Sequence, residues 1–308
     1  MESIRFIALS VSRKTILFVF TCCALPVLLA AQNNPGIKKP LKPVFRQQKI
    51  SEPPVVLQLD PFYKKYANAG GIPIISSEKV TNDALLVAST IVNYMLQKRK
   101  DIRTELINRK CKVQVIAASE GQTDLPEYND MKKPAKDDKR LTDDEREAYD
   151  KPGGIGSMTD SDYWNERARG MGGDDGASCA EENLLGYKED RYYGENILVH
   201  EFSHTIFFAI KKVDPDLYAQ VEVAYEAAKN NGMYEGQYAI NTLEEYWAEG
   251  TQWWFWSNFE FYDGDTRVQS PEDLAAYDPT LYHLLEKVYA VHKIPADVYY
   301  RQNLRPAR

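Results

Sequence analysis

Two histidines and a glutamate within five residues carry the clearest chemical signal in this 308-residue chain: residues 200–204 are His-Glu-Phe-Ser-His. On an α-helix, His200 and His204 lie one turn apart on the same face, so their imidazoles can converge on one cation. Glu201 lies about a quarter-turn away, where a carboxylate can take a proton from metal-bound water. This spacing predicts a catalytic zinc site with Glu201 as the general base.

The segment around these residues, NILVHEFSHTIFFAI, is apolar nearly all round and predicts a buried helix over 195–212. Imidazole and carboxylate groups are costly to bury without partners, and a metal ion supplies one. The competing interpretation is a pair of core histidines, each hydrogen-bonded to a carbonyl group.

A catalytic zinc ion takes three protein ligands and keeps one position for water. The metzincin solution is excluded, because the chain has Phe207 and Ile210 where that motif needs glycine and histidine. The third ligand must therefore come from elsewhere. The best source is a predicted helix over 242–257, whose acidic candidates are Glu244, Glu245 and Glu249.

Two of these acids also fit helix-capping patterns. Glu245 follows Thr242 by three residues, and Glu244 has the same relation to Asn241. Glu245 and Glu249 share one helical face, so if Glu245 binds zinc, Glu249 is placed to hold the second nitrogen of a histidine. The spacing alone leaves the choice of ligand open.

The motif His-Glu-Phe-Ser-His, then Tyr238, then Glu245-Tyr-Trp-Ala-Glu249 resembles the catalytic domain of anthrax lethal factor and its secreted zincin-like relatives. The resemblance covers roughly residues 180–255. It implies that Glu245 is the third zinc ligand, and that Tyr238, seven residues before it, faces the metal. Ser203 departs from the small glycine common in such helices.

The resemblance also implies an α+β, zincin-like metallopeptidase fold, with a small sheet, an active-site helix and a helical C-terminal half. One Zn²⁺ per chain and a peptide or protein substrate follow from it. Relatives pair an extended substrate with an edge strand near the zinc helix. By resemblance this role falls on Glu182, Asn183, Leu184 and Leu185, within a predicted strand over 180–187.

Tyr238 also has a physical rationale. A phenol close to zinc can donate a hydrogen bond to the developing oxyanion or protonate the leaving amine. The competing interpretation is one more packed tyrosine among the 20 in the chain.

The N-terminus has the features of a secretory signal peptide over residues 1–31. Arg5, Arg13 and Lys14 precede an apolar stretch that ends in small residues at Ala30 and Ala31. We therefore expect a secreted, extracellular protein that has no membrane segment after signal cleavage. An uncleaved signal anchor is the alternative.

Export would leave two cysteines in the mature chain, Cys111 and Cys179. In an oxidising compartment an even pair predicts a disulfide bond. Two buried free thiols are the alternative.

The chain divides by composition into four parts. Residues 1–31 are the predicted signal peptide, 32–75 a Pro/Lys-rich linker or pro-segment, 76–300 the metallopeptidase domain and 301–308 a tail. Within the domain, apolar periodicity predicts further elements. These are helices over 83–97, 102–106, 216–230, 271–277 and 280–291, a strand over 112–117, and a short helix that Thr142 begins.

Composition narrows the function further. The chain is 44% hydrophobic and 27% charged, as in ordinary globular proteins. With 38 Lys and Arg against 45 Asp and Glu, its net charge of -7 argues against broad nucleic-acid binding. The sequence predicts a secreted zinc metalloendopeptidase. The alternative is a non-catalytic secreted or cell-surface binding protein that retains the fold.

Overall fold

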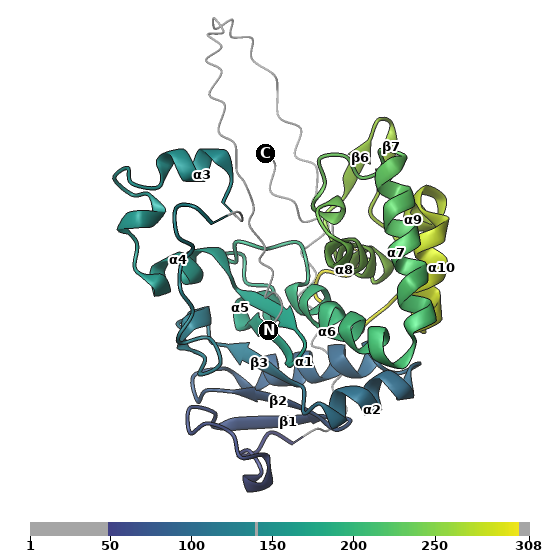
Figure 1. Ribbon diagram of the computed structural model, residues 1–308. Coiled ribbons are helices and arrows are strands. Elements are labelled where there is room, and N and C mark those ends of the chain that lie inside the picture. Colours follow the sequence, from purple (N-terminus) through teal and green to yellow (C-terminus); the bar gives the residue numbers. More distant parts are fainter. Residues whose placement is uncertain (1–48, 139–140, 302–308) are drawn as a thin grey trace, which may run out of the picture.

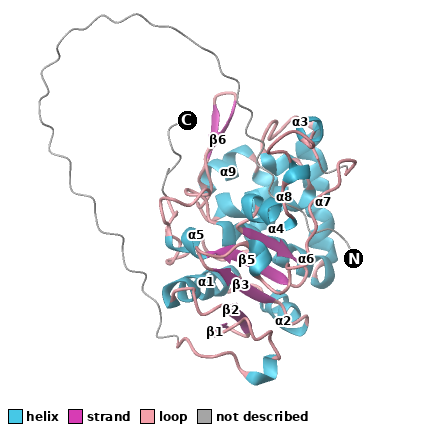
Figure 2. Ribbon diagram, turned by 90° about the vertical axis from the view of Figure 1, so that its left-hand side faces the viewer, coloured by secondary structure: helices cyan, strands magenta, loops and turns pink. Residues whose placement is uncertain are grey.

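A small mixed sheet forms one layer of the protein. The computed structural model describes residues 49–138 and 141–301. The strands of the sheet are β1 (Lys65–Ala69), β2 (Ile72–Ser76), β3 (Lys112–Ile116), β4 (Gly170–Gly173) and β5 (Gly176–Ala180). Their order is β1-β2-β3-β5-β4, and Figure 2 shows the succession from β1 to β5. The three inner strands are parallel, and both edge strands run antiparallel to their neighbours.

Helices make up most of the rest. The α-helices of the described residues are α1 (Asn82–Met95), α2 (Lys100–Asn108), α3 (Asp143–Ala148), α4 (Asp160–Arg167), α5 (Glu181–Leu185), α6 (Ile197–Val213), α7 (Pro215–Asn230), α8 (Leu243–Trp254), α9 (Pro271–Tyr277) and α10 (Pro279–Val288). Short 3₁₀ helices are η1 (Val55–Leu57), η2 (Gln122–Asp124), η3 (Ile155–Ser157) and η4 (Tyr238–Ile240). A separate hairpin pairs β6 (Phe261–Asp263) with β7 (Thr266–Val268). The architecture is mixed α+β, with a helical C-terminal half.

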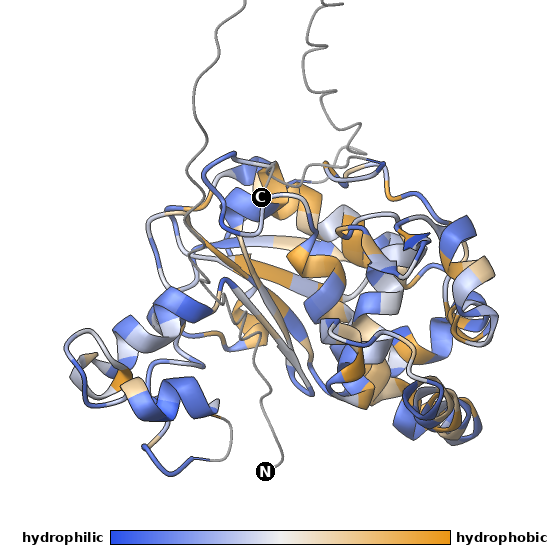
Figure 3. Cartoon of the chain, turned by 90° about the horizontal axis from the view of Figure 1, so that it is seen from above, coloured by the Kyte–Doolittle hydropathy of each residue, from blue (hydrophilic) through white to orange (hydrophobic). Residues whose placement is uncertain are grey.

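Alternating side chains give the sheet two different faces. Ile74, Val113 and Val115 point into the main core, which they share with α1, α2 and α6. Ile75 and Ile116 point the other way and pack in a smaller cluster with Tyr63 and Leu125. Figure 3 colours much of the central strands and adjoining helix hydrophobic, whereas peripheral helices show both colours. The helix with the two histidines, α6, therefore lies between the sheet and the C-terminal helices (Figure 1).

Most predicted elements are confirmed to within a few residues. The pattern-based expectations match α1, α2, α3, α6, α7, α8, α9, α10 and β3. Asp, Ser or Thr caps begin several of these helices, as the patterns require. In the described part of the chain, no helix is long and apolar enough to cross a membrane.

The predicted domain start at residue 76 is too late. Strands β1 and β2 lie inside the predicted linker over 32–75 and complete the sheet. Pro73 lies in β2, but the ladder with β3 begins only at Ile74, so this ladder needs no donor from the proline. Residues 1–31 and 302–308 lie outside the described residues.

The predicted strand over 180–187 is wrong. Strand β5 ends at Ala180, and Glu181–Leu185 forms α5, which Gly186 closes in the left-handed conformation with φ 68°. Residues 182–185 therefore present no strand edge to a substrate. The apolar run of this segment is short, and periodicity does not separate a short strand from a helical turn at that length.

The predicted disulfide between Cys111 and Cys179 is also wrong, because both thiols are free and buried. Register explains why. Lys112 lies opposite Gly176 and Val115 opposite Cys179, so the two cysteines are four positions out of step on neighbouring strands. At about 3.3 Å per residue this separates them by roughly 13 Å, well beyond disulfide reach.

A buried carboxylate fastens the C-terminal segment to the start of α6. Asp297 accepts hydrogen bonds from the Asn196 side chain and the Tyr299 N–H, both at 2.9 Å. Asn196 is the N-cap of α6 and accepts from the Val199 N–H. Burial raises the pKa of Asp297 to about 6, although hydrogen bonds from Asn196, Tyr299 and Ser257 oppose the shift. The segment thus holds the helix at some energetic cost when Asp297 is charged.

This cost predicts a pH-dependent effect of Asp297→Asn. Because the folded pKa exceeds the ordinary value of 3.8, the native state binds the proton more tightly, and wild type loses stability as pH rises from 3.8 to about 6. The variant lacks this loss. Its free energy of unfolding relative to wild type should therefore increase by up to about 3 kcal/mol between pH 4 and pH 7, measured by urea denaturation. An equal difference at both pH values would contradict this account.

Candidate active site

Two helices bring the predicted metal ligands together. Helix α6 carries His200 and His204 one turn apart, and α8 crosses close to it with Glu245 in its first turn. Thr242 caps α8 by accepting from the Glu245 N–H at 3.2 Å. The backbone N–H of Glu245 therefore takes part in the cap, while its carboxylate points to the histidines. The alternative interpretation, in which the Glu245 side chain caps the helix, does not hold.

The carboxylate of Glu245 points at both imidazoles. Its Oε2 lies 3.0 Å from His200 Nε2 and 3.6 Å from His204 Nε2. All three residues are buried, and one ligand atom from each lies within 4.8 Å of the other two. The structure thus brings together the three residues predicted as metal ligands, His200, His204 and Glu245. Glu244 and Glu249 are not part of this group.

The electrostatics of the group are those of a strongly coupled cluster. Burial alone lowers the pKa of His200, but its hydrogen bond to Glu245 and the nearby carboxylates reverse this and raise the pKa to about 10. Burial raises the pKa of Glu245, yet the two imidazoles outweigh it and hold that pKa well below its ordinary value. The raised pKa of His200 and the lowered pKa of Glu245 favour an imidazolium beside a carboxylate. A divalent cation at the same place would also balance the charge of that carboxylate.

Glu201 lies beside this group and is 3% exposed. The N–H of Gly172 in β4 donates to its carboxylate, and this bond and the imidazoles lower its pKa. Burial outweighs them, so the pKa of Glu201 is raised. Its Oε1 is buried and has no hydrogen-bond partner among the described residues. A buried acceptor of this kind can hold and deprotonate a water molecule at the metal position.

Tyr238 reaches the same group from η4. Its hydroxyl donates to Glu245 Oε1 at 3.2 Å, so the two oxygens of Glu245 face different partners. Burial and the neighbouring carboxylates raise the pKa of Tyr238, which keeps the phenol protonated at neutral pH. The structure therefore brings Tyr238 to the cluster, as predicted, with a proton available to donate.

The second nitrogen of His200 is held by a residue that the sequence did not suggest. His200 Nδ1 lies 3.0 Å from Gln252 Oε1, but 3.5 Å from Glu249 Oε1. Glu249 instead accepts from the Asn258 side chain at 2.8 Å. Gln252 lies seven residues after Glu245, two turns along α8, and this spacing was the available signal. Gln252 thus takes the role predicted for Glu249.

The edge strand nearest the site is β4, not the predicted residues 182–185. Strand β4 ends the sheet order, and it packs directly on α6. A Cβ added at Gly172 would lie 2.1 Å from the carbonyl oxygen of Glu201, and one at Gly170 would lie 2.5 Å from Ile197 Cγ2. Glycine at both positions permits this approach. The short sequence Gly-Met-Gly-Gly has no strand periodicity, so the pattern missed it.

The four residues predicted to bind substrate have structural roles instead. Glu182 forms a two-pronged ion pair with buried Arg169. The Asn183 side chain donates to Asp190 at 2.7 Å and accepts from the Ile197 N–H at 2.9 Å, which braces the loop before α6. Leu184 and Leu185 pack against the main core.

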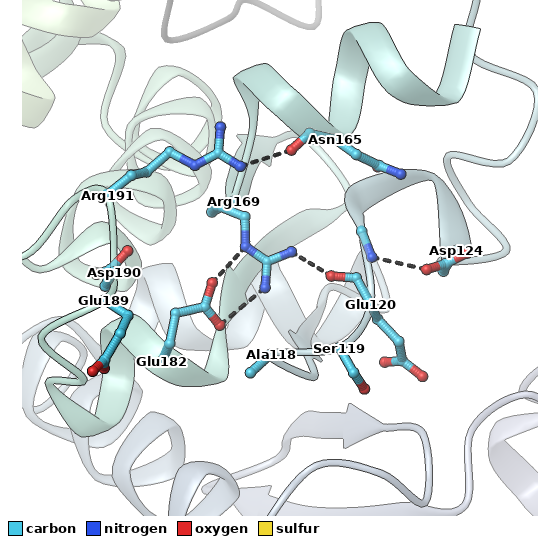
Figure 4. Close-up of a pocket in the computed structure, with 11 residues that line it drawn as sticks. Ala118, Ser119, Glu120, Asp124, Asn165, Arg169, Glu182, Glu189, Asp190 and Arg191 are labelled. Carbon is cyan, nitrogen blue, oxygen red and sulfur yellow. Dashed lines mark hydrogen bonds and ion pairs between the residues drawn. The ribbon is translucent and has the colours of Figure 1, made fainter. Parts of the chain in front are cut away.

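A separate hollow of about 490 Å³ lies near the C-terminal ends of β3 and β5 (Figure 4). None of its lining residues belongs to the histidine cluster. Arg169 at its base is paired with Glu182 and with the carbonyl oxygens of Ala117 and Glu120. Asp124 accepts from the Gly121 N–H at 2.8 Å. The buried cation of this hollow therefore has its partners within the protein.

The donor set of the cluster fits a zinc ion. Two imidazole nitrogens and one carboxylate oxygen are the ligands of a catalytic site that keeps one position for water. The unpartnered Oε1 of Glu201 supports the same interpretation, because a structural site needs no such acceptor. Ser203, which stands where the resembling motif has a small glycine, donates to the His200 carbonyl at 2.7 Å within its own helix.

Comparisons with known proteins give a distant likeness among solved structures. No protein-family model matches the chain, and no curated protein matches it by sequence. Among solved structures, it is similar to the PRO-PRO endopeptidase (PPEP-2) from Paenibacillus alvei, at 13% identity and a TM-score of 0.43. The match covers 70% of this chain and 97% of that one. A likeness of this extent carries no functional argument; the side chains of the site do.

The contact between β4 and α6 predicts unequal effects of two neighbouring substitutions. Gly172→Ala places a Cβ against the Glu201 carbonyl and should cost about 1–3 kcal/mol in the free energy of unfolding. Gly173→Ala, where a Cβ meets nothing within 4 Å, should change it by less than about 0.5 kcal/mol. Chemical denaturation of both variants measures the difference. Equal losses would show that close packing of β4 on α6 is not required.

Proposed function

We propose that this protein is a zinc metallopeptidase with a zincin-like fold. The observation that carries the proposal is the buried meeting of His200, His204 and Glu245, with Glu201 beside them. Two of these ligands come from a His-x-x-x-His helix and the third from a later helix, with the general base between the two histidines in sequence. This combination has a direct use in hydrolysis and little use in a purely structural site.

Each residue has a defined role. His200, His204 and Glu245 would hold the zinc ion. Zinc polarises a carbonyl group and brings the pKa of a water molecule to about 7. Glu201 Oε1 would accept a proton from the attacking water molecule and pass it to the leaving amine. Tyr238 remains a phenol and donates to the oxygen of the scissile carbonyl as negative charge develops there.

The substrate would bind along β4. Among the described residues, β4 pairs with another strand only at β5, and its Gly172 N–H donates to Glu201. An extended peptide that adds to this edge would pass next to the general base, and main-chain hydrogen bonds would supply affinity. We therefore propose a peptide or protein substrate and endopeptidase activity.

Two further parts of the proposal concern the whole chain. Residues 1–31 would direct secretion, and cleavage would leave an extracellular enzyme with no membrane segment. The catalytic domain would extend through residue 300, with its start earlier than residue 76 because β1 and β2 belong to the sheet. A non-catalytic binding protein with the same fold is the second candidate, and the unpartnered Glu201 oxygen disfavours it.

Glu201→Gln separates the two candidates. The variant keeps all three zinc ligands but loses the base, so zinc content should stay near one per chain while peptide cleavage falls by about 10²–10⁴-fold. Cleavage is measured on a peptide library with and without a chelator, and zinc by atomic absorption. Glu226→Gln, an exposed position on α7, serves as the control and should leave both values unchanged.

Two results would contradict the proposed function. Cleavage that survives complete removal of zinc would exclude the mechanism. If zinc-loaded wild type cleaves no member of the library, and so does not differ from Glu201→Gln, the result would favour the binding protein.

A further inference from the structure

The side chain of Gln252 joins the two helices that supply the ligands. It is fully buried on α8, and its Nε2 donates to the carbonyl oxygen of Asn196 at 3.1 Å. The same amide also forms a hydrogen bond with the side chain of Glu195. Its Oε1 lies 3.0 Å from His200 Nδ1. All the hydrogen-bonding capacity of the amide group is directed at α6 and the residues that begin it.

The partners of Gln252 fix the orientation of its amide. A backbone carbonyl oxygen can only accept, so the NH₂ group must face Asn196. The opposite orientation would set the amide oxygen against the Asn196 carbonyl oxygen. Oε1 must therefore face His200, and an amide oxygen can only accept.

This orientation determines the protonation of His200. Its Nδ1 must carry a hydrogen to donate to Gln252, so the nitrogen that can offer a lone pair to a metal ion is Nε2. In the structure Nε2 faces Glu245 Oε2 at 3.0 Å, a contact in which Nε2 is the donor. The Asn196 carbonyl that orients Gln252 also accepts from the His200 N–H at 3.2 Å, in the first turn of α6. The start of the helix and the tautomer of its first ligand are thus set by the same group.

We propose that Gln252 is a positioning residue that holds His200 in the Nδ1–H tautomer and so presents Nε2 to the metal ion. This inference rests on the proposed function of the site. Glu249, at 3.5 Å from Nδ1 and already bonded to Asn258, does not substitute for it. Gln252 touches neither the metal position nor Tyr238, and it acts through His200.

Gln252→Met tests the proposal, because methionine has a similar size and shape but no amide group. Zinc affinity, measured by competition with a chromophoric chelator, should weaken by about 10–100-fold, as for other residues that support a metal-binding histidine. In the zinc-loaded protein, proton NMR should show a slowly exchanging Nδ1–H signal from His200 in wild type. We expect that signal to shift and broaden in Gln252→Met.

Two further variants separate positioning from packing. Gln114→Met removes another buried glutamine amide, on β3, and should leave zinc affinity and the NMR signal unchanged. Gln252→Glu keeps an acceptor for Nδ1–H, and a protonated carboxyl can still donate to Asn196. It should therefore restore the Nδ1–H signal and lie closer to wild type in zinc affinity than Gln252→Met.

The outcomes are distinguishable. Equal zinc affinity in wild type, Gln252→Met and Gln114→Met, with the Nδ1–H signal intact in all three, would overturn the positioning role alone. Equal losses in Gln252→Met and Gln252→Glu would assign Gln252 to packing and also overturn it. A wild-type protein that binds no zinc would instead overturn the proposed function.

Discussion

The rest of this structure depends on the burial of two imidazoles and one carboxylate at the contact of α6 with α8. Ionisable groups with so little exposure are stable only if they neutralise one another or hold a cation. Here His200 and His204 of α6 face the carboxylate of Glu245 on α8, which lies some 40 residues later in the chain. Any change that separates α6 from α8 would leave buried charge uncompensated, so packing and chemistry are coupled.

Several contacts around the cluster hold α6 and α8 together. Asp297 fixes the N-cap of α6, and Gln252 ties the same end of α6 to α8. Glycines in β4 let the sheet edge approach the backbone of Glu201. Aromatic packing completes the junction, with Phe207 of α6 stacked on Trp247 of α8 at 5.2 Å between ring centroids. Both faces of α6 are thereby held, one by the sheet and one by the C-terminal helices.

The helices that carry the ligands could be predicted because their signals are local. Residue spacing placed His200 and His204 on one face, and the apolar pattern gave the burial of α6. Resemblance to a known motif favours Glu245 over Glu244 and Glu249 as the third metal ligand, whereas spacing alone does not separate the three. The structure brings Glu245 to the histidines, and it shows that a backbone N–H satisfies the cap that competed for this residue.

The parts that could not be predicted depend on contacts between distant segments. Strand β4 is too short and glycine-rich for a periodic pattern, and α5 has an apolar run that suits a strand equally well. Whether Cys111 can reach Cys179 depends on the register of β3 against β5, which local sequence patterns do not reveal. The choice of Gln252 over Glu249 depends on an amide orientation set by Asn196, which no spacing rule encodes.

X-ray absorption spectroscopy at the zinc edge of the zinc-loaded protein tests the central claim most directly. The account predicts one zinc ion per chain with two imidazole nitrogens at about 2.0–2.1 Å and oxygen ligands at about 2.0–2.2 Å. One imidazole should disappear from the spectrum in His204→Ala. A spectrum without imidazole scattering, or one that His204→Ala leaves unchanged, would contradict the claim that α6 and α8 form a zinc site.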